Sequence, residues 1–315
     1  MRIYYTTDLH GSDKCWKKFL ATPKYYKADV VVIGGDITGK VIVPIIMNKR
    51  GRAEATFMGR KRKMKKEKDI ETFKQVVANA GQYPLEVTEE EYAEYQNDPS
   101  KLENIFRQLL TGRVEEWVKL ADERLADQNV RCFVAAGNDD IFEIDDVLAK
   151  SETIEMHDGR LVEFDGFQMF GMGYANMTPW NCPRDISEEE LGDRLEEMAS
   201  HIKNWDLAVL DLHAPPYDTG LDSAPELTDD MRMALDATGQ PKMVPVGSKA
   251  VRDFIIKYQP LVSMHGHIHE SPGIKKMGKT TALNPGSEYA EGILRGAVID
   301  LDPKEGLVNV NLVTG

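Results

Sequence analysis

The sequence predicts an α/β fold in which two sheets pack face to face and helices cover the outside. Short apolar runs rich in β-branched residues alternate with helical patterns along the 315 residues, as is typical of α/β proteins. The large number of predicted strands favours two packed sheets over a single one. Hydrophobic residues make up 42% of the chain and charged residues 29%, which is enough apolar material for a sizeable core.

The predicted strands fall into two groups. The first group is hydrophobic almost throughout, as expected for strands that are covered on both faces. It comprises residues 3–7, 30–33, 130–135, 207–212 and 261–264. The second group is expected to be antiparallel or meandering, and it comprises residues 153–156, 161–164, 167–172, 281–283, 297–301 and 308–313.

Residues 40–128 are expected to form an insertion within a single domain that spans residues 1–315. The insertion begins with two possible short strands, 41–46 and 53–57. Helical periodicity then predicts a short helix around 88–95 and a long amphipathic helix that begins at the capping box Ser100-x-x-Glu103. Because the apolar stripe of the long helix needs a partner surface, we expect a helical cap and not an independent domain.

Composition and charge exclude several classes of protein. Acidic residues outnumber basic ones by 52 to 39, and this balance argues against non-specific binding to nucleic acid or to an anionic membrane over the whole surface. The longest apolar run, residues 41–47, is far shorter than the ~20 residues that cross a membrane. No secretory signal is visible and the three cysteines form no CxxC pair, so we expect a soluble, cytoplasmic protein without disulfides.

Polar side chains that can bind metals follow each strand of the first group. The segments are Asp8-Leu9-His10-Gly11, Gly34-Gly35-Asp36, Gly137-Asn138-Asp139-Asp140, His213 and His265-Gly266-His267-Ile268-His269. Open α/β sheets bind ligands outside the carboxyl ends of their strands, so we expect these side chains to converge. Imidazole, carboxylate and amide ligands together favour Mn, Fe, Zn, Ni or Co.

The motifs DLHG, GGD, GND, LDLHAPP and GHIH, in this order between residues 8 and 269, resemble those of the metallophosphoesterase (calcineurin-like) superfamily. The resemblance implies a four-layer αββα sandwich of two mixed sheets flanked by helices, with two divalent metal ions. It implies one ion held by Asp8, His10, Asp36 and His269, and a second held by Asp36, Asn138, His213 and His267. We therefore predict a phosphodiesterase or phosphatase for small organic or nucleotide phosphoesters, in which a metal-bridging hydroxide attacks phosphorus.

One departure from the family pattern concerns protonation of the leaving group. Many members have a His where this chain has Asp139, and several have an Asp where it has Gly39. Asp139 is a weak general acid, since the ordinary pKa of an aspartate is ~3.9 and nearby cations lower it. We expect a preference for good leaving groups, such as aryl phosphodiesters, with Asn138 and the weak acid Asp139 as the catalytic residues beside the metals.

Other residues are predicted to surround this centre. His265 and Asp140 are expected to support the ligands through hydrogen bonds. An aromatic and amide-rich loop could orient a substrate or could simply pack on the core; its candidate residues are Tyr174, Asn176, Trp180 and Asn181. His157 and His201 are expected on the surface without a catalytic part.

The basic run of residues 60–68 leaves the choice of partner open. We expect a solvated, charged hairpin, with contact to nucleic acid or to an acidic surface of a second subunit in a homo-oligomer as alternatives. Two alternative functions are also left open. One is a metal-dependent nuclease that uses this hairpin, and the other is a metal-binding scaffold that has lost catalysis. No membrane partner is expected.

Overall fold

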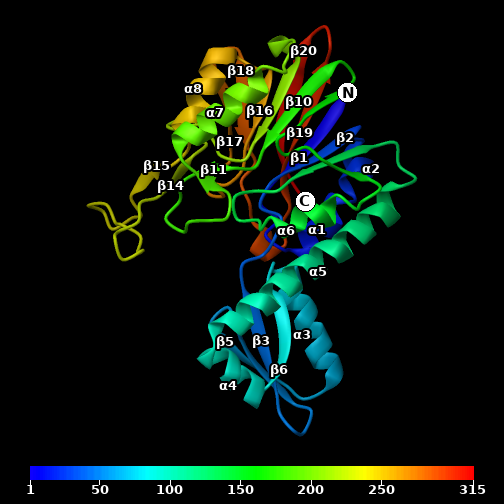
Figure 1. The fold of residues 1–315 in the computed structure, drawn as a ribbon, viewed down its shortest axis with the longest axis vertical. Helices are drawn as coiled ribbons and strands as arrows, with labels where there is room; N and C mark the ends of the chain where they lie inside the picture. Colours follow the sequence, from blue (N-terminus) through cyan, green and yellow to red (C-terminus); the bar gives the residue numbers. More distant parts are fainter.

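Two six-stranded sheets form the centre of the molecule (Figure 1). This computed structural model describes residues 1–315, with the side chain of residue 99 outside the description. The first sheet has the order β20-β19-β1-β2-β7-β8 and consists of β1 (Arg2–Thr6), β2 (Val30–Gly34), β7 (Arg131–Ala135), β8 (Ile154–Met156), β19 (Arg295–Asp302) and β20 (Gly306–Thr314). The second has the order β17-β18-β16-β13-β10-β9 and consists of β9 (Leu161–Phe164), β10 (Phe167–Met172), β13 (Ala208–Leu212), β16 (Val262–Met264), β17 (Gly273–Met277) and β18 (Thr280–Asn284).

Alternate residues of the central strands bury two different surfaces. On β1, Ile3 and Tyr5 face the second sheet and pack in one apolar cluster with Met169 and Val209. Tyr4 points the other way, toward the helices on the outer face. Both faces of the strand are therefore covered, which explains why its sequence is apolar without alternation.

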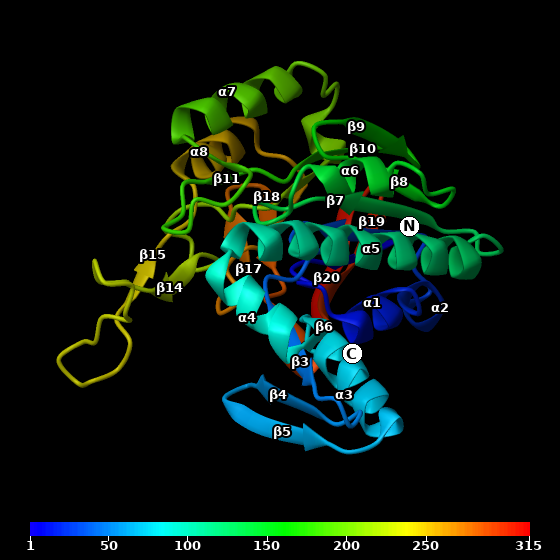
Figure 2. The same cartoon turned by 60° about the horizontal axis from the view of Figure 1, so that its bottom comes forward.

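Helices complete the four layers, so the predicted αββα sandwich is confirmed. The outer face of the first sheet packs against α1 (Asp13–Phe19), α5 (Pro99–Leu125) and α6 (Glu143–Leu148). The second sheet is covered by α7 (Glu188–Ala199) and α8 (Lys249–Tyr258), which lie together beyond it in Figure 2. A short helix, α2 (Thr22–Tyr26), follows α1.

The expected direction of some strands was wrong. Strands β8, β10 and β18 were expected to be antiparallel or meandering. Strand β8 instead pairs in parallel with β7. Strands β10 and β18 are antiparallel to β9 and β17 on one side, as expected, but pair in parallel with β13 and β16 on the other. Helix α6 connects β7 to β8 and helix α7 lies between β10 and β13, and a helical crossover of this kind returns the chain in the same direction. Within the two six-stranded sheets, antiparallel pairing involves the edge strands β9 and β17 and the ribbon β19–β20, which pairs with β1.

The insertion contains a sheet of its own, with the order β5-β4-β3-β6. Its strands are β3 (Ile42–Met47), β4 (Ala53–Phe57), β5 (Arg60–Met64) and β6 (Tyr83–Thr88), and its helices are α3 (Glu67–Asn79) and α4 (Glu89–Asn97). Strand β5 pairs antiparallel with β4 and carries the exposed basic residues of the expected charged hairpin, whereas the sequence patterns did not reveal β6 or α3. In β6, Pro84 speaks against a strand, but β6 is an edge strand, where a missing amide donor is tolerated.

The long helix α5 returns from the insertion to the main body (Figure 2). Its N-cap is Asp98, whose carboxylate accepts from the Ser100 amide at 3.2 Å, so the predicted capping box at Ser100 was wrong. Trp117 stacks on Trp16 with ring centroids 4.7 Å apart and donates to Asp13 at 2.7 Å. Helix α1 thus covers the apolar stripe of α5.

Short strands and 3-10 helices lie in the segments that connect the main strands and helices. They are β11 (Ala175–Asn176), β12 (Asp185–Ile186), β14 (Ser223–Pro225), β15 (Met243–Pro245), η1 (Trp205–Leu207) and η2 (Tyr289–Glu291). The segment between β14 and β15 projects from the body as an extended arm (Figure 1). None of the helices that the structure describes combines the length and the apolar character needed to cross a membrane.

Candidate metal centre

The polar segments that follow the apolar strands meet at one place. Strands β1, β2 and β7 approach it from the first sheet, and β13 and β16 approach it from the second. Their tips form groups whose possible ligand atoms lie within 4.8 Å of one another: Asp8–His10–His269, Asp36–His213–His267 and His10–Asp36–Asp139. The convergence predicted from the sequence is therefore seen, although the assignment of ions to these groups remains a prediction.

An unusual backbone conformation orients several of these side chains. Asp8, His10, Asp36 and His267 have positive φ angles of 56°, 39°, 49° and 68°. Residues other than glycine seldom adopt this conformation, because it raises their conformational free energy. Such strained residues occur most often at functional sites. Backbone hydrogen bonds hold it in place: the Asp8 amide donates to the Gly35 carbonyl at 3.0 Å, and the His10 amide donates to the Asp36 carbonyl at 2.9 Å.

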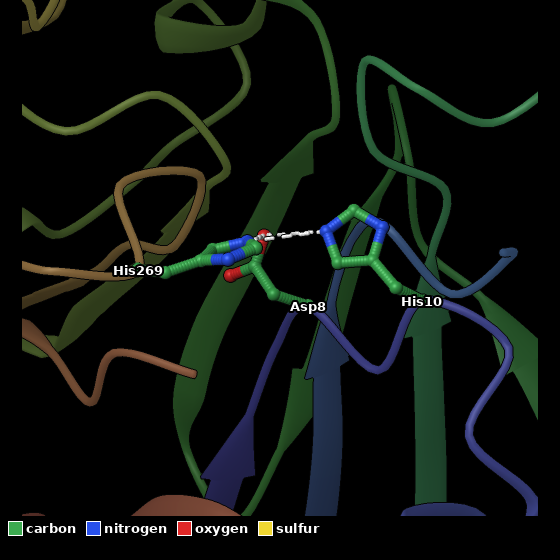
Figure 3. A group of neighbouring side chains, drawn as sticks. All are labelled: Asp8, His10 and His269. Carbon is green, nitrogen blue, oxygen red and sulfur yellow. Dashed lines mark hydrogen bonds and ion pairs between the residues drawn. The ribbon is translucent and has the colours of Figure 1, made fainter. Parts of the chain in front are cut away.

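The first group is shown in Figure 3. The Nε2 atoms of His10 and His269 face each other at 3.1 Å, and His269 Nε2 lies 3.3 Å from Asp8 Oδ1. The Asp8 carboxylate also accepts from the His267 amide at 3.0 Å. These atoms converge on one point from two loops, the one after β1 and the one after β16.

Asp36 joins the first group to the second. Its Oδ2 lies 3.6 Å from His10 Nε2, while its Oδ1 lies 3.3 Å from His213 Nε2. On the far side, the Asn138 amide oxygen is 3.2 Å from His213 Nε2. One carboxylate therefore offers one oxygen to each group, as a bridging ligand would.

Neighbouring groups fix the ligands in orientation. His213 Nδ1 lies 2.8 Å from the Gly34 carbonyl, which leaves Nε2 for the centre. The Asn138 side-chain amide donates to Asp185 at 2.8 Å, so its oxygen is turned inward. Contacts of this kind set the tautomer and the aim of metal ligands.

Asp140 and His265 are both buried beside the converging segments, and their predicted role in supporting the ligands remains a prediction. Asp140 is fully buried and accepts from the backbone amides of Ile37, Thr38 and Gly137 at 2.8–3.0 Å, so it ties the two ligand-bearing loops together. His265 lies between the Leu212 and Ala214 carbonyls and the hydroxyl of Ser263. Neither side chain is in a group that could hold an ion.

The electrostatics of these residues fit bound cations. Burial lowers the pKa of His10 to about 3 and that of His267 to about 4, so both rings are neutral at neutral pH, the form that can bind a metal. Burial also opposes a charge on His213, but the adjacent Asp36 carboxylate outweighs this and raises its pKa to about 10. Buried carboxylates require positive partners, and cations would replace the proton on His213 in that role.

Sequence reasoning missed Lys40 and Cys182, which lie beside Asp139. The Cys182 thiol donates to Asp139 Oδ1 at 2.8 Å, and the Lys40 ammonium contacts Oδ2. Burial and the charge of Asp36 raise the pKa of the Asp139 carboxyl, while Lys40 opposes the shift. The neighbouring motif gave no sign of Lys40, because nothing in the sequence places its side chain beside residue 139.

Tyr289 was also missed, and it borders the centre on the other side. Its ring lies 4.8 Å from the His10 ring and 5.9 Å from the His269 ring. A cleft of about 430 Å³ opens next to it, lined by residues that include His269, Ser287 and Arg295. Only the tertiary structure brings this loop beside His10 and His269.

The aromatic loop lies near the centre, but its predicted substrate residues are not among the ligand groups. Trp180 is 65% exposed and Asn181 is exposed, whereas Asn176 donates to the Val246 carbonyl. Tyr174 packs under the Arg194 guanidinium at 4.2 Å. The loop reaches the centre through Cys182 and Asp185 instead, and a role of the four predicted residues in substrate binding remains a prediction.

The predicted surface position of His157 was wrong. Its side chain is fully buried between the sheets, and Nε2 lies 2.6 Å from Asp211 Oδ2. The turn-like sequence around it does form a turn, but a bridge from Asp158 to Gly171 holds that turn against β10. A signal was present in the sequence, since Asp211 interrupts the otherwise apolar strand β13. His201 is exposed, as predicted.

Comparisons with known proteins complete the description. No family model matches the chain. Over 130 residues, 41% of the chain, it is 33% identical to the uncharacterized protein MJ1162 of Methanocaldococcus jannaschii, and the match spans 52% of that relative, about half of its length. The structure of TT1561 from Thermus thermophilus has a TM-score of 0.56 and 13% identity, and the match covers 100% of this chain and 97% of that chain.

A structure described as that of a novel archaeal phosphodiesterase matches with a TM-score of 0.40 and 11% identity, covering 100% of both chains. The match to the TT1561 structure shows a likeness of fold over the whole chain. At these identities the comparisons describe the fold and not the substrate.

Proposed function

We propose that the chain is a metallophosphoesterase that uses two divalent metal ions to hydrolyse phosphodiesters of small organic or nucleotide substrates. The observation that supports this most strongly is the position of Asp36. Its two carboxylate oxygens face His10 on one side and His213 on the other, at 3.6 and 3.3 Å. A bridging carboxylate between two His-containing groups is the arrangement expected of a two-metal site.

When bound, the ions would supply Lewis acidity toward phosphoryl oxygens and would lower the pKa of water. The residues of the chain would hold the ions and keep the ligand side chains in orientation. Asp8, His10 and His269 form one set of ligands, while Asn138, His213 and His267 form the other. Asp185 and the Gly34 carbonyl keep Asn138 and His213 turned toward the centre.

The leaving group receives little help from a proton donor of the usual kind. Asp139 occupies the position of the family's His, and Gly39 occupies that of its Asp partner. The Asp139 carboxylate is engaged by Cys182 and Lys40. We therefore expect rates that depend strongly on the leaving-group pKa, with aryl diesters hydrolysed faster than alkyl diesters.

The test is turnover of bis-aryl and mono-aryl phosphates by metal-stripped protein to which Mn²⁺ or Ni²⁺ is returned. We expect metal-dependent hydrolysis, with the diester preferred. Asp36→Asn should lose about 10²-fold or more in kcat, since the bridging charge is lost. Asp165→Asn, the same change at an exposed position, is the control. Equal activity of the stripped and reloaded proteins would refute the proposal.

The basic hairpin supports a second candidate, a nuclease. Strand β5 is an exposed edge strand whose sequence is RKRKM, and Lys63 is the one residue of residues 60–68 with an ion pair among those that the structure describes, to Glu54. Unpaired cations on an edge can bind a polyanion. Binding of single- or double-stranded nucleic acid that falls steeply with salt would favour this candidate; salt-insensitive turnover of small esters alone would exclude it.

A further inference from the structure

Gly39 occupies the position where several members of the family carry an aspartate, and the structure explains why no side chain fits there. A Cβ atom at Gly39 would collide with the carbonyl oxygen of Gly81 and would lie 3.1 Å from the carbonyl oxygen of His10. The Gly39 amide donates to the Tyr83 hydroxyl at 2.9 Å. The insertion therefore packs directly against this backbone, and it fixes the residue that follows.

That following residue is Lys40, four positions after the bridging Asp36. Its side chain is 50% exposed, and its ammonium contacts Asp139 Oδ2. The carboxylate of Asp139 is itself held: Oδ1 accepts from Cys182 at 2.8 Å, and the Asp139 amide donates to Asp36 at 3.0 Å. The Lys40 ammonium thus lies at the edge of the centre, beside residue 139, the position at which many family members have a His.

The surroundings show how close this cation lies to the ligands. Asp139, the partner of Lys40, lies within 4.8 Å of ligand atoms of His10 and Asp36. Burial raises the pKa of Tyr289, and the charge of Lys40 opposes this rise. Lys40 itself keeps its proton, because Asp139 and Asp36 outweigh the effect of burial and raise its pKa.

An ammonium group has three donors, and one contact to Asp139 leaves donors and half of the side-chain surface open to a ligand. A fixed cation next to a reacting phosphate stabilises negative charge where it develops. A surface ion pair with no further role would not require the second hydrogen bond from Cys182, a partly buried thiol, to fix the carboxylate.

We propose that Lys40 binds the leaving-group oxygen of the phosphodiester and stabilises its charge, with Asp139 and Cys182 as positioning residues. In the hydrolysis, the oxygen of water bonds to phosphorus and the ester P–O bond breaks with its electron pair on the leaving oxygen. That oxygen, beside the Lys40 ammonium, finally carries one proton of the water. The assignment rests on the proposed phosphoesterase function and replaces acid catalysis by electrostatic stabilisation.

The experiment compares Lys40→Met and Lys40→Arg with wild type on a series of aryl methyl phosphodiesters of increasing leaving-group pKa. We expect Lys40→Met to lose about 10- to 100-fold in kcat. The loss should grow as the leaving group becomes poorer, and Lys40→Arg should recover part of it. Lys24→Met, at an exposed position on α2, is the matched control and should behave as wild type.

A second readout does not depend on turnover. The affinity of metal-loaded protein for inorganic phosphate, measured by titration calorimetry, should fall about tenfold in Lys40→Met and remain unchanged in Lys24→Met, with equal bound metal in both. The positioning role predicts that Asp139→Asn lowers kcat more than it raises KM. It also predicts that Asp139→Asn adds little to Lys40→Met, because both act through one group.

The outcomes separate this inference from the proposed function. If Lys40→Met has the same leaving-group dependence and phosphate affinity as wild type, the proposed role of Lys40 is overturned. If Asp36→Asn is inactive in the same experiments, the proposed phosphoesterase function still stands. Loss of bound metal in Lys40→Met would also overturn it, since Lys40 would then support the ligands. Full activity of Asp36→Asn would instead overturn the phosphoesterase function.

Discussion

At the scale of single residues, the candidate centre depends on close backbone contacts as much as on its ligands. Gly137 lies against the Asp36 backbone, and Gly35 lies against the His213 ring, where an added Cβ atom would come within 2.5 Å of Nδ1. Any side chain at these positions would push a ligand away. The glycines in the motifs therefore matter because they leave space for the neighbouring side chains and backbone. Asp8 and Asp36, which have positive φ, add backbone strain that the surrounding contacts must offset.

The first prediction tests this close packing at Gly137. In Gly137→Ala, the new Cβ would overlap the backbone nitrogen of Asp36, so the bridging carboxylate must move. We expect at least a tenfold loss of metal affinity, measured by competition with a chelating dye, in a protein whose circular dichroism is unchanged. Gly112→Ala is the control: it lies in α5 with open space around it and should stabilise the protein by up to about 1 kcal/mol. Normal metal affinity in Gly137→Ala would contradict the argument.

The second prediction concerns the buried pair of His157 and Asp211. Replacing His157 by Ala leaves the Asp211 carboxylate in an apolar interior without its partner. We expect a loss of about 3–5 kcal/mol in the free energy of unfolding, measured with urea. His201→Ala, at an exposed position, should change it by less than about 0.5 kcal/mol. A similar small effect of His157→Ala would show that the pair does not contribute to stability.

At the scale of elements, helix α5 connects the insertion to the main body. Its stripe, which includes Val114, Ala121 and Leu125, belongs to the same apolar cluster as Trp16 on α1. The helical period predicted this stripe, whereas its partner could be found only in the structure. The same limit applies to strand direction, because the apolar pattern of β10 or β18 is the same in a parallel and an antiparallel pair.

The third prediction tests the contact between α5 and α1. Trp117 is 4% exposed and stacks on Trp16, so Trp117→Ala should cost about 3–5 kcal/mol of unfolding free energy in chemical denaturation. Tyr25→Ala, at a side chain that is 79% exposed, should cost much less. Equal effects of the two changes would mean that the stacked contact does not secure the helix.

At the scale of the whole molecule, the centre lies where the two sheets meet. Asp8, Asp36 and Asn138 follow strands of the first sheet, while His213 and His267 follow strands of the second. Any ion that binds both sets would connect the two halves of the sandwich. Metal binding should therefore stabilise the folded protein as a whole.

The fourth prediction follows from this linkage. Mn²⁺ at 100 times its dissociation constant should raise the free energy of unfolding by about 2.7 kcal/mol, provided that the unfolded chain does not bind it. Thermal melting of stripped and reloaded protein measures the effect. Asp36→Asn should lose most of the increase and Asp165→Asn should keep it. An increase that survives in Asp36→Asn would place the bound ion elsewhere.

The sequence by itself determined the strands of both main sheets except β17, the long helix α5 and the seven polar side chains that meet at the centre. These features are local: an apolar run, a helical period, or a residue at the end of a strand. The tertiary structure decided strand direction, the sheet of the insertion, the burial of His157 and the position of Lys40 beside Asp139. Each of these depends on which distant segments lie together, and residue order in one segment does not specify its neighbours in space.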